Sequence, residues 1–345
     1  MQTTRQDEIF GIVLQHEPIG ISGILEKMAG RISMPTLNRE LAKLKAAQFV
    51  VIEGKGPGTR YKINLNGLVR AQVDADSFFK TDIDNRKILE RYNPFVFEAL
   101  ANEPLFSGEE TSILDEFTDE YRNKVKKTST VNYKKEFERL MIELSWKSSQ
   151  IEGNTYDLLD TEQFLKYNIE APNHSTEEAQ MLLNHKAAIE YTSEHSDLFQ
   201  ELSQSKIIDI HTLLTQSMGI SKTIRQRIVR ITGTKYTPPD NQFLIEEGLE
   251  KLCMSVNANA SHYEKALLAV LLISYLQPFE DGNKRTARLT ANALLMSANM
   301  CPLSYRSIAP VDYKKSILLF YELNNINAFK KIFIEQYQFA VENYF

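Results

Sequence analysis

The sequence has 345 residues, of which 43% are hydrophobic and 25% are charged, and its formal net charge is −5 at pH 7. This length exceeds the usual size of one domain, so we expect two or three folded units, each with a core of its own. The composition excludes an intrinsically disordered chain, and the negative net charge excludes a protein coated in nucleic acid, so any nucleic-acid-binding surface must be local.

The sequence also gives indications of the cellular compartment. The longest apolar run, residues 266–276, is about half the length needed to cross a bilayer, and we interpret it as a buried helix. The first ten residues, MQTTRQDEIF, have neither the apolar core nor the small-residue cleavage site of a secretory signal. Cys253 and Cys301 lie far apart and predict no thiolate metal site. We therefore expect a cytoplasmic protein.

Residues 1–66 are predicted to form three short helices and a β-hairpin. Helical apolar spacing predicts two helices within residues 9–28, with Ser22 as the cap of the second. Ser33 is placed to cap a third helix, which has a proline in its first turn. Residues 49–65 contain two apolar segments around a glycine-rich turn, which predicts the hairpin.

Three helices followed by a hairpin resemble a winged helix-turn-helix, in which residues 33–45 would be the recognition helix. Residues 1–66 contain nine basic and six acidic side chains, so this part carries +3 and the remaining chain carries −8. This polarity favours a surface that binds DNA, and the alternative is a protein-docking module. The candidate DNA contacts are Arg39, Lys43, Lys45, Lys55 and Arg60.

The rest of the chain is predicted to be mainly α-helical. Residues 67–130 are polar and helix-prone, and we interpret them as connecting helices. From residue 131 to 345 the pattern is helical with one interruption at residues 227–239, where alternating residues, a Gly-Thr pair and two prolines predict a short hairpin.

The stretch QPFEDGNKRTAR, residues 277–288, connects two of these helices. The apolar helix before it must end near Pro278, because proline cannot continue the backbone hydrogen bonds. Gly282 permits a turn that other residues disfavour, and a second helix is expected to begin at Gly282 or Asn283. The free N–H groups and the positive dipole end of that helix predict an anion site.

Three charged side chains of this stretch fit a bound polyphosphate. Arg285 and Arg288 are three residues apart, so both project from one face in the first turns of the helix. Asp281 is placed where a carboxylate could hold Mg²⁺ between phosphate oxygens. The alternative is a charged loop whose arginines pair with nearby acids.

The twelve residues resemble the signature of the Fic (Fido) family, H-x-F-x-D/E-G-N-x-R-x-x-R, at every specified place except the first, where Gln277 replaces the histidine. Residues 148–153, SSQIEG, resemble the inhibitory-helix pattern S/T-x-x-x-E-G/N of many Fic proteins. The stretch ITGTKYTPPD, residues 231–240, looks like the family's flap. The resemblance covers about residues 131–345.

This resemblance implies a helical bundle with a short β-hairpin flap, and transfer of AMP from Mg-ATP to a Ser, Thr or Tyr hydroxyl of a protein, which can be the chain itself. Asp281 would hold Mg²⁺, and Arg285 and Arg288 would contact the inner phosphates and the γ-phosphate. Lys284 matches the phosphorylating, Doc-like branch of the family, so phosphoryl transfer stays an alternative. The remaining implied nucleotide contacts are Gly282 and Asn283, and the implied target-binding flap residues are Ile231, Thr232, Gly233, Thr234, Lys235 and Tyr236.

Glu152 is predicted at the end of the helix formed by about residues 132–153, with Gly153 as its stop. The resemblance implies that Glu152 binds Arg288, so that ATP cannot place its γ-phosphate correctly. Ser148, one turn earlier, would steady Glu152 or the phosphate pocket. The alternative is an exposed glutamate near the end of a helix.

Gln277 stands where the family has the histidine that accepts the proton of the attacking hydroxyl. Glutamine has no basic nitrogen, so the rate of transfer should be lower by a factor of about 10²–10⁴. His262 lies too far along the same helix to replace it, and His211 could approach only through a tertiary contact that the sequence does not predict. We expect an autoinhibited and impaired adenylyltransferase; the alternative is a nucleotide-binding pseudoenzyme that acts as a DNA-binding transcriptional regulator.

Overall fold

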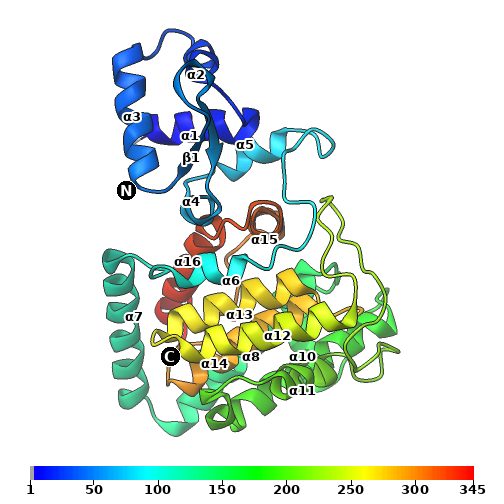
Figure 1. The fold of residues 1–345 in the computed structure, drawn as a ribbon. Helices are drawn as coiled ribbons and strands as arrows, with labels where there is room; N and C mark the ends of the chain where they lie inside the picture. Colours follow the sequence, from blue (N-terminus) through cyan, green and yellow to red (C-terminus); the bar gives the residue numbers. More distant parts are fainter. Residues whose placement is uncertain (1–3) are drawn as a thin grey trace. The chain divides into compact units, whose positions relative to one another are not determined.

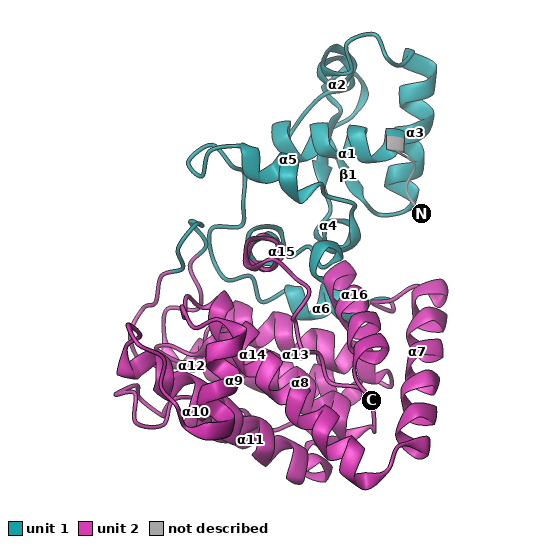
Figure 2. Ribbon diagram, turned by 180° about the vertical axis from the view of Figure 1, so that it is seen from behind, with its two compact units in different colours: residues 1–103, 231–236, 318–329 teal, residues 104–230, 237–317, 330–345 magenta. Residues whose placement is uncertain are grey.

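The computed structural model describes residues 4–345, and the chain is mainly helical, as predicted (Figure 1). It divides into two compact units, which are coloured teal and magenta in Figure 2. Unit 1 comprises residues up to 103 together with 231–236 and 318–329, and unit 2 comprises residues 104–230, 237–317 and 330–345. The predicted functional division into residues 1–66, 67–130 and 131–345 stays a prediction.

Unit 1 begins with three helices and a two-stranded sheet. These are α1 (Thr4–His16), α2 (Ile21–Lys27), α3 (Met34–Ala46), β1 (Val50–Glu53) and β2 (Arg60–Ile63), with the short 3-10 helix η1 (Gly56–Gly58) between the strands. The strands are antiparallel, with Val50 opposite Ile63 and Glu53 opposite Arg60, so the predicted hairpin is confirmed. The short helices α4 (Leu65–Arg70), α5 (Ala75–Lys80) and α6 (Val96–Ala101) follow.

The sequence predicts the N-cap of α3 correctly but not the N-cap of α2. The hydroxyl of Ser33 accepts a hydrogen bond from the N–H of Thr36 at 3.4 Å, which confirms the predicted cap of α3. The prediction for Ser22 was wrong, because Gly20 occupies the cap position of α2 and Ser22 lies inside the helix. Ile19 forms a backbone bridge with Tyr61, so the chain stays extended up to Gly20 and the helix begins directly after it.

The core of unit 1 joins the apolar faces of these elements. Ile9, Ile24 and Leu37 are fully buried, as their helical spacing predicts. Leu319 and Leu323 belong to the same cluster of buried side chains. This shared core explains why residues 318–329, far away in the sequence, belong to unit 1.

Unit 2 is a helical unit built around one buried helix. Its elements are α7 (Gly108–Lys127), α8 (Thr130–Ile151), α9 (Leu158–Tyr167), α10 (Thr176–Glu194), the 3-10 helix η2 (Ser196–Gln200), α11 (Gln204–Leu214), α12 (Gln242–Ala258), α13 (His262–Leu276) and α14 (Asn283–Ser297), with parts of α15 (Pro310–Leu323) and α16 (Asn327–Asn343). Every residue from 266 to 276 in α13 is buried, which confirms the predicted buried helix. α13 packs against α12 and α14, which run beside it in Figure 1. Within the described residues, no helix combines the length and the apolar character that a membrane span requires.

The strands predicted at residues 227–239 are not formed, since β1 and β2 are the only strands among residues 4–345. The backbone carbonyls of Arg227 and Pro239 accept hydrogen bonds from the Arg225 guanidinium, at 2.8 and 2.7 Å, rather than from a partner strand. Gly233 has a φ of 90°, and the two prolines have no N–H to donate. An isolated two-stranded hairpin is marginally stable in water. Side-chain contacts therefore determine the conformation of this connection.

Candidate functional site

The connection between α13 and α14 has a left-handed residue at each end. Gln277 follows α13 with φ 47° and ψ 60°, and its N–H donates to the carbonyl of Ile273 at 3.0 Å. Gly282 precedes α14 with φ 80°, which places the start of the second helix as predicted. A Cβ at Gly282 would lie 3.1 Å from Cγ2 of Thr215, so both conformation and space favour glycine here.

The side chain of Asn283 closes this loop. Its Oδ1 accepts from the N–H of Phe279 at 2.8 Å, and its Nδ2 donates to the carbonyl of Phe279, also at 2.8 Å. The side-chain amide of Asn283 is therefore bonded to the backbone of the loop, and Asn283 would meet an anion through its main-chain N–H. The ring of Phe279 is buried, so it fills the core below the loop.

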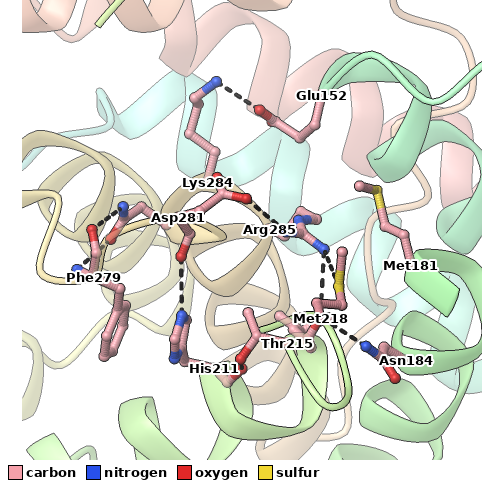
Figure 3. Close-up of polar contacts among 12 residues, drawn as sticks. Glu152, Met181, Asn184, His211, Thr215, Met218, Phe279, Asp281, Lys284 and Arg285 are labelled. Atoms are coloured by element: carbon pink, nitrogen blue, oxygen red, sulfur yellow. Dashed lines mark hydrogen bonds and ion pairs between the residues drawn. The ribbon is translucent and has the colours of Figure 1, made fainter. Parts of the chain in front are cut away.

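His211, from α11, holds the same loop from below. Its ring stacks on Phe279 with centroids 3.7 Å apart, and its Nε2 donates to the carbonyl oxygen of Asp281 at 3.0 Å (Figure 3). Burial lowers the pKa of His211 to about 4, so the imidazole is neutral at physiological pH. The sequence does not predict these contacts of His211 with Phe279 and Asp281. Through them His211 supports the loop.

Arg285 and Asp281 are neighbours with opposite exposure. The Arg285 side chain is 2% exposed, and its Nη2 lies 3.5 Å from Oδ2 of Asp281, whose side chain is 69% exposed. Burial lowers the pKa of Arg285, while the Asp281 carboxylate opposes that effect. Nη1 of Arg285 donates to the carbonyl of Leu214 at 3.4 Å. Its guanidinium is thus held in place beside the start of α14.

The exposed carboxylate of Asp281 fits Mg²⁺ that arrives with a nucleotide. Mg²⁺ in phosphate-binding sites commonly takes one or two protein carboxylates, with phosphate oxygens and water as its other ligands. In the described part of the chain no group of three or more His, Cys, Asp or Glu residues could hold a metal. The single exposed carboxylate of Asp281 is the kind of ligand that a metal shared with phosphates uses.

Arg288 is fully buried and its guanidinium is surrounded by acceptors. Nε donates to Oγ of Ser148 at 2.9 Å, Nη2 donates to the Ser148 carbonyl at 2.8 Å, and Nη1 donates to Oε1 of Glu152 at 2.9 Å. The guanidinium carbon lies 5.1 Å from the ring centroid of Tyr313, a cation–π contact. The structure thus brings together Arg288, Ser148 and Glu152, and Ser148 binds the arginine.

The end of α8 directs Glu152 toward this arginine. Glu152 is the C-cap, and Gly153 follows with φ 106°. The N–H groups of Gly153 and Asn154 donate back to the carbonyls of Gln150 and Ser149, at 3.0 and 3.1 Å, which is the Schellman pattern of a helix end. Gly153 therefore supplies the left-handed residue that this motif requires.

Glu152 binds a second cation, which the sequence does not predict. Nζ of Lys284 donates to Oε2 of Glu152 at 2.6 Å, and Figure 3 shows the two side chains pointing toward each other. Burial opposes ionisation of Glu152, but Arg288 and Lys284 together lower its pKa to about 2. Each carboxylate oxygen therefore has its own cation.

The sequence does not predict two further buried side chains of this region, Arg225 and His185. Arg225 is 2% exposed, and its Nε donates to the carbonyl of Gln277 at 2.6 Å. His185 is buried as well, and burial, Arg285 and Arg288 lower its pKa far below the usual value. Arg225 donates to backbone carbonyls, and because every residue has one, the sequence does not indicate which residues are its partners.

The residues predicted for the flap, 231–236, pack as part of unit 1. Tyr236 is 2% exposed and lies against Tyr321 with ring centroids 5.5 Å apart. Nζ of Lys235 lies 3.5 Å from Oε1 of Glu90. Tyr236 is thus a packing residue in this structure, and its predicted role in target binding stays a prediction.

The predicted DNA contacts lie on the surface of unit 1. The side chains of Arg39 and Lys43 on α3 are 64% and 54% exposed, and both bind Glu40, at 3.3 and 3.2 Å. Lys45, Lys55 and Arg60 are also exposed. These cations are accessible, although Glu40 compensates part of their charge.

Comparisons with known proteins place this site in a family. The model of the Fic/DOC family matches residues 201–295. Protein adenylyltransferase Fic of Nematostella vectensis is 28% identical over 241 residues, which cover 64% of this chain and 54% of that protein. Protein adenylyltransferase fic-1 of Caenorhabditis elegans is 27% identical over 168 residues, which cover 47% of this chain and 32% of that protein. The chain thus spans between about a third and about half of the length of these curated relatives.

Solved structures share the fold. A Fic domain containing signaling protein from Bacteroides thetaiotaomicron superposes with a TM-score of 0.56 at 19% identity, covering 67% of this chain and 94% of that chain. Fic-1 from C. elegans superposes with a TM-score of 0.58 at 19% identity, covering 100% of this chain and 99% of that chain. Residues 201–295 of this chain are therefore a Fic/DOC family domain.

Proposed function

We propose that this chain is a Fic-type protein adenylyltransferase, which transfers AMP from ATP to a Ser, Thr or Tyr hydroxyl of a protein and is held inactive by Glu152. The observation that carries the proposal is the cluster of Lys284, Arg285 and Arg288 at the start of α14, with Glu152 bound to two of the three. The relatives named protein adenylyltransferase support the same reaction.

Inhibition by Glu152 follows from competition for one guanidinium. Arg288 is fully buried, so water cannot replace a partner that it loses, and only another anion could. With a pKa of about 2, Glu152 is ionised at physiological pH and is therefore always a competitor of the γ-phosphate. Asp281 would hold Mg²⁺, which would neutralise the phosphate charges of bound ATP. Loss of Glu152 would free Arg288 and Lys284 together.

The transfer itself needs a proton acceptor. The hydroxyl oxygen of the target forms a bond to the α-phosphorus, the bond from that phosphorus to the bridging oxygen breaks, and pyrophosphate leaves with the electron pair. The amide Nε2 of Gln277 donates to the carbonyl of Ser274 at 2.7 Å, and an amide oxygen can accept a hydrogen bond from a hydroxyl but has no basic lone pair for its proton. An amide cannot keep the proton, which must pass to water, and the step should be slower by about 10²–10⁴.

Transfer of label from α-labelled ATP tests the proposal in four proteins: the chain as it stands, Glu152→Gly, Gln277→His and the double variant. We expect ATP binding to increase with Glu152→Gly, and transfer to rise by about 10²–10⁴ when Gln277→His is added. Glu138→Gln, at an exposed position of α8, is the control and should change neither quantity. A double variant that binds Mg-ATP and transfers no label would contradict the proposal, and transfer of γ-label would support the phosphotransferase alternative.

A second function, DNA binding that responds to nucleotide, is favoured by the exposed cations of α3. If this row of Arg39 and Lys43 contacts phosphates, duplex affinity should fall steeply with salt, and each alanine substitution should reduce the salt slope by about 1. Lys251→Ala, which removes an exposed cation of α12, should leave the slope unchanged. Titration of labelled duplex at several salt concentrations, with and without ATP, measures both effects. No duplex affinity at low salt would exclude this function.

A further inference from the structure

Residues 231–236, the predicted target-binding flap, are in contact with another segment of the same chain. Residues 84–90 lie against them, and both segments belong to unit 1. Residues 86–90 form no helix or strand, and the N–H of Leu89 donates to the backbone carbonyl of Glu322, also in unit 1, at 2.7 Å. Residues 84–90 are therefore held by individual contacts, which a competing segment could replace one by one.

Arg86 makes the central contact. Its Nη2 donates to the carbonyl of Gly233 at 2.8 Å and to Oε1 of Glu322 at 3.0 Å. The side chains of Arg86 and Glu322 are 6% and 0% exposed, and among residues 4–345 Arg86 is the only ion-pair partner of Glu322. A buried carboxylate that loses its partner is strongly destabilised, so Glu322 requires a cation at this place. Any segment that replaces residues 84–90 must therefore bring one.

Lys235 of the flap contacts the same segment before and after Arg86 in the sequence. Its Nζ donates to the carbonyl of Asp84 at 3.3 Å and lies 3.5 Å from Oε1 of Glu90. The side chains of Lys235 and Glu90 are 32% and 65% exposed, and ion pairs that water reaches contribute little to stability. Arg86 therefore dominates the binding of this segment, and Lys235 orients it along the flap.

The ion pair of Arg86 with Glu322 leaves two buried groups unsatisfied. Nε of Arg86 and Oε2 of Glu322 have no hydrogen-bond partner in the described part of the chain. The pair thus uses one nitrogen and one oxygen, whereas an arginine and a carboxylate can form two parallel hydrogen bonds. Each buried group that stays unsatisfied costs free energy. An arginine of another chain that used both oxygens of Glu322 would therefore be a better partner than Arg86.

We propose that residues 84–90 occupy the binding site of the protein target, and that the target presents an arginine to Glu322 from an extended segment. Glu322 then selects the target through one buried charge, and the carbonyl of Gly233 accepts a hydrogen bond from the same arginine. Lysine is a poorer partner, because its ammonium is strongly hydrated and cannot bind two oxygens as a planar fork. This inference rests on the proposed function, in which residues 231–236 recruit the target.

Peptide binding tests this inference on the full chain without nucleotide. The probe is a fluorescein-labelled peptide of residues 81–94, TDIDNRKILERYNP, and its anisotropy reports binding. Arg86→Met removes the chain's own arginine, so we expect this variant to bind the peptide at least about 10-fold more tightly than the chain as it stands. Peptides that carry Arg86→Met or Arg86→Lys should bind this variant more weakly, the first by about 10-fold. Equal binding of the methionine peptide would overturn the inference, and equal binding of the lysine peptide would overturn the choice of arginine.

Two further variants control for the buried charge. Arg86→Met leaves Glu322 unpaired, whereas Arg86→Met combined with Glu322→Gln removes both charges and should unfold at a higher temperature than Arg86→Met alone. The combined variant should bind the peptide at least about 10-fold more weakly than Arg86→Met, and equal binding would overturn the role of Glu322. Arg306→Met removes an arginine that lies 3.2 Å from the buried Glu143 of unit 2, and it should bind the peptide as weakly as the chain as it stands.

Amide hydrogen exchange provides a test that needs no variant of the chain. The N–H of Leu89 donates to the carbonyl of Glu322, so its exchange reports whether residues 84–90 leave the flap. Peptide at about 10 times the dissociation constant measured with Arg86→Met should stabilise the open state and accelerate this exchange by about 10-fold. The methionine peptide at the same concentration should have no effect. Unchanged exchange with the arginine peptide would overturn the inference.

Label transfer and peptide binding report on the two proposals separately. The variant with Glu152→Gly and Gln277→His needs no peptide to transfer α-label from ATP, and the peptide needs no ATP to bind. Normal peptide binding without any label transfer would contradict the proposed function. Label transfer together with peptide binding that does not depend on Glu322 would overturn the inference about the target, so the two failures are distinguishable.

Discussion

Two glutamates of this protein, one in each compact unit, bind two cations each. In unit 1, Glu40 accepts from an arginine and a lysine whose side chains are 64% and 54% exposed. In unit 2, Glu152 accepts from Arg288, which is fully buried, and from Lys284, which is 25% exposed. Burial opposes ionisation at both carboxyl groups, and hydrogen bonds and nearby charges nevertheless lower both pKa values.

The difference lies in what can replace the carboxylate. Water can solvate the exposed partners of Glu40, so such pairs contribute about 0–1 kcal/mol to stability. Arg288 has no access to water, and a buried cation that loses its partner is strongly destabilised. The same pairing is therefore solvated in unit 1, whereas in unit 2 the buried guanidinium needs an anionic partner, which under the proposed function is either Glu152 or a phosphate of ATP.

The largest expected effect concerns the two arginines. Arg288→Met leaves Glu152 with one cation and removes two bonds to Ser148, so unfolding of unit 2 should become easier by about 3–5 kcal/mol. Arg39→Met should change the unfolding free energy by less than about 1 kcal/mol. Urea unfolding followed by the fluorescence of Trp146, the single tryptophan, measures unit 2, and circular dichroism follows both units. Similar losses for the two variants would break the comparison.

The effect of pH on Glu152 should be next in size. Its pKa is lower in the folded chain than in the unfolded chain, so its stabilisation is present above about pH 4.5 and is lost as the pH falls toward 2. Glu152→Gln should lower the unfolding free energy by about 2–3 kcal/mol at neutral pH, and the difference should vanish at low pH. Calorimetric melting temperatures of both proteins between pH 8 and 2.5 test this. A difference that already shrinks between pH 7 and 6 would show that another group controls it.

Lys284 should have a smaller effect, with a sign that depends on Glu152. In the chain as it stands, Lys284→Met loosens Glu152 and should tighten ATP binding by about 3-fold, since one of two cation contacts is lost. In a Glu152→Gly background the same change removes a cation from the phosphate site and should weaken binding by about 3-fold. Calorimetric titration of the four proteins gives the coupling, and Lys251→Met serves as the control. The same sign in both backgrounds would mean that Lys284 does not hold Glu152 in solution.

Salt should produce the smallest effect and should again separate the two glutamates. Lys43→Met should change the unfolding free energy by less than about 0.5 kcal/mol at 0.05 M NaCl and by nothing measurable at 1 M, because exposed pairs are screened. The effect of Glu152→Gln should persist at 1 M, because salt screens a buried ion pair much less than an exposed one. Urea unfolding at both salt concentrations measures the pair of effects. A loss of the Glu152 effect at high salt would argue that this pair is solvated.

The loop and its flanking helices could be predicted from sequence because their signals are local. Pro278 ends α13, Gly282 supplies the left-handed residue before α14, and Arg285 and Arg288 share a face through their spacing alone. The cap of α3 at Ser33 is equally local.

Other contacts depend on elements that meet only in the folded chain. Lys284 and Glu152 are 132 residues apart, and the position of Lys284 in the signature specifies no residue type. His211 and Arg225 bind backbone carbonyls, which every residue offers. The strands predicted at residues 227–239 failed for a related reason, since alternation describes a strand but does not supply its partner.

The single guanidinium of Arg225 joins the two ends of the connection that carries residues 231–236. Its Nη1 and Nη2 donate to the carbonyls of Arg227 and Pro239, and its Nε donates to the carbonyl of Gln277. Because Arg225 holds the two ends of this loop together, the entropy cost of closing the loop is met when the chain folds. If this loop binds a target as proposed, the peptide would therefore meet only the entropy cost of ordering its tip, and Arg225 keeps the base of the loop attached to the backbone of Gln277.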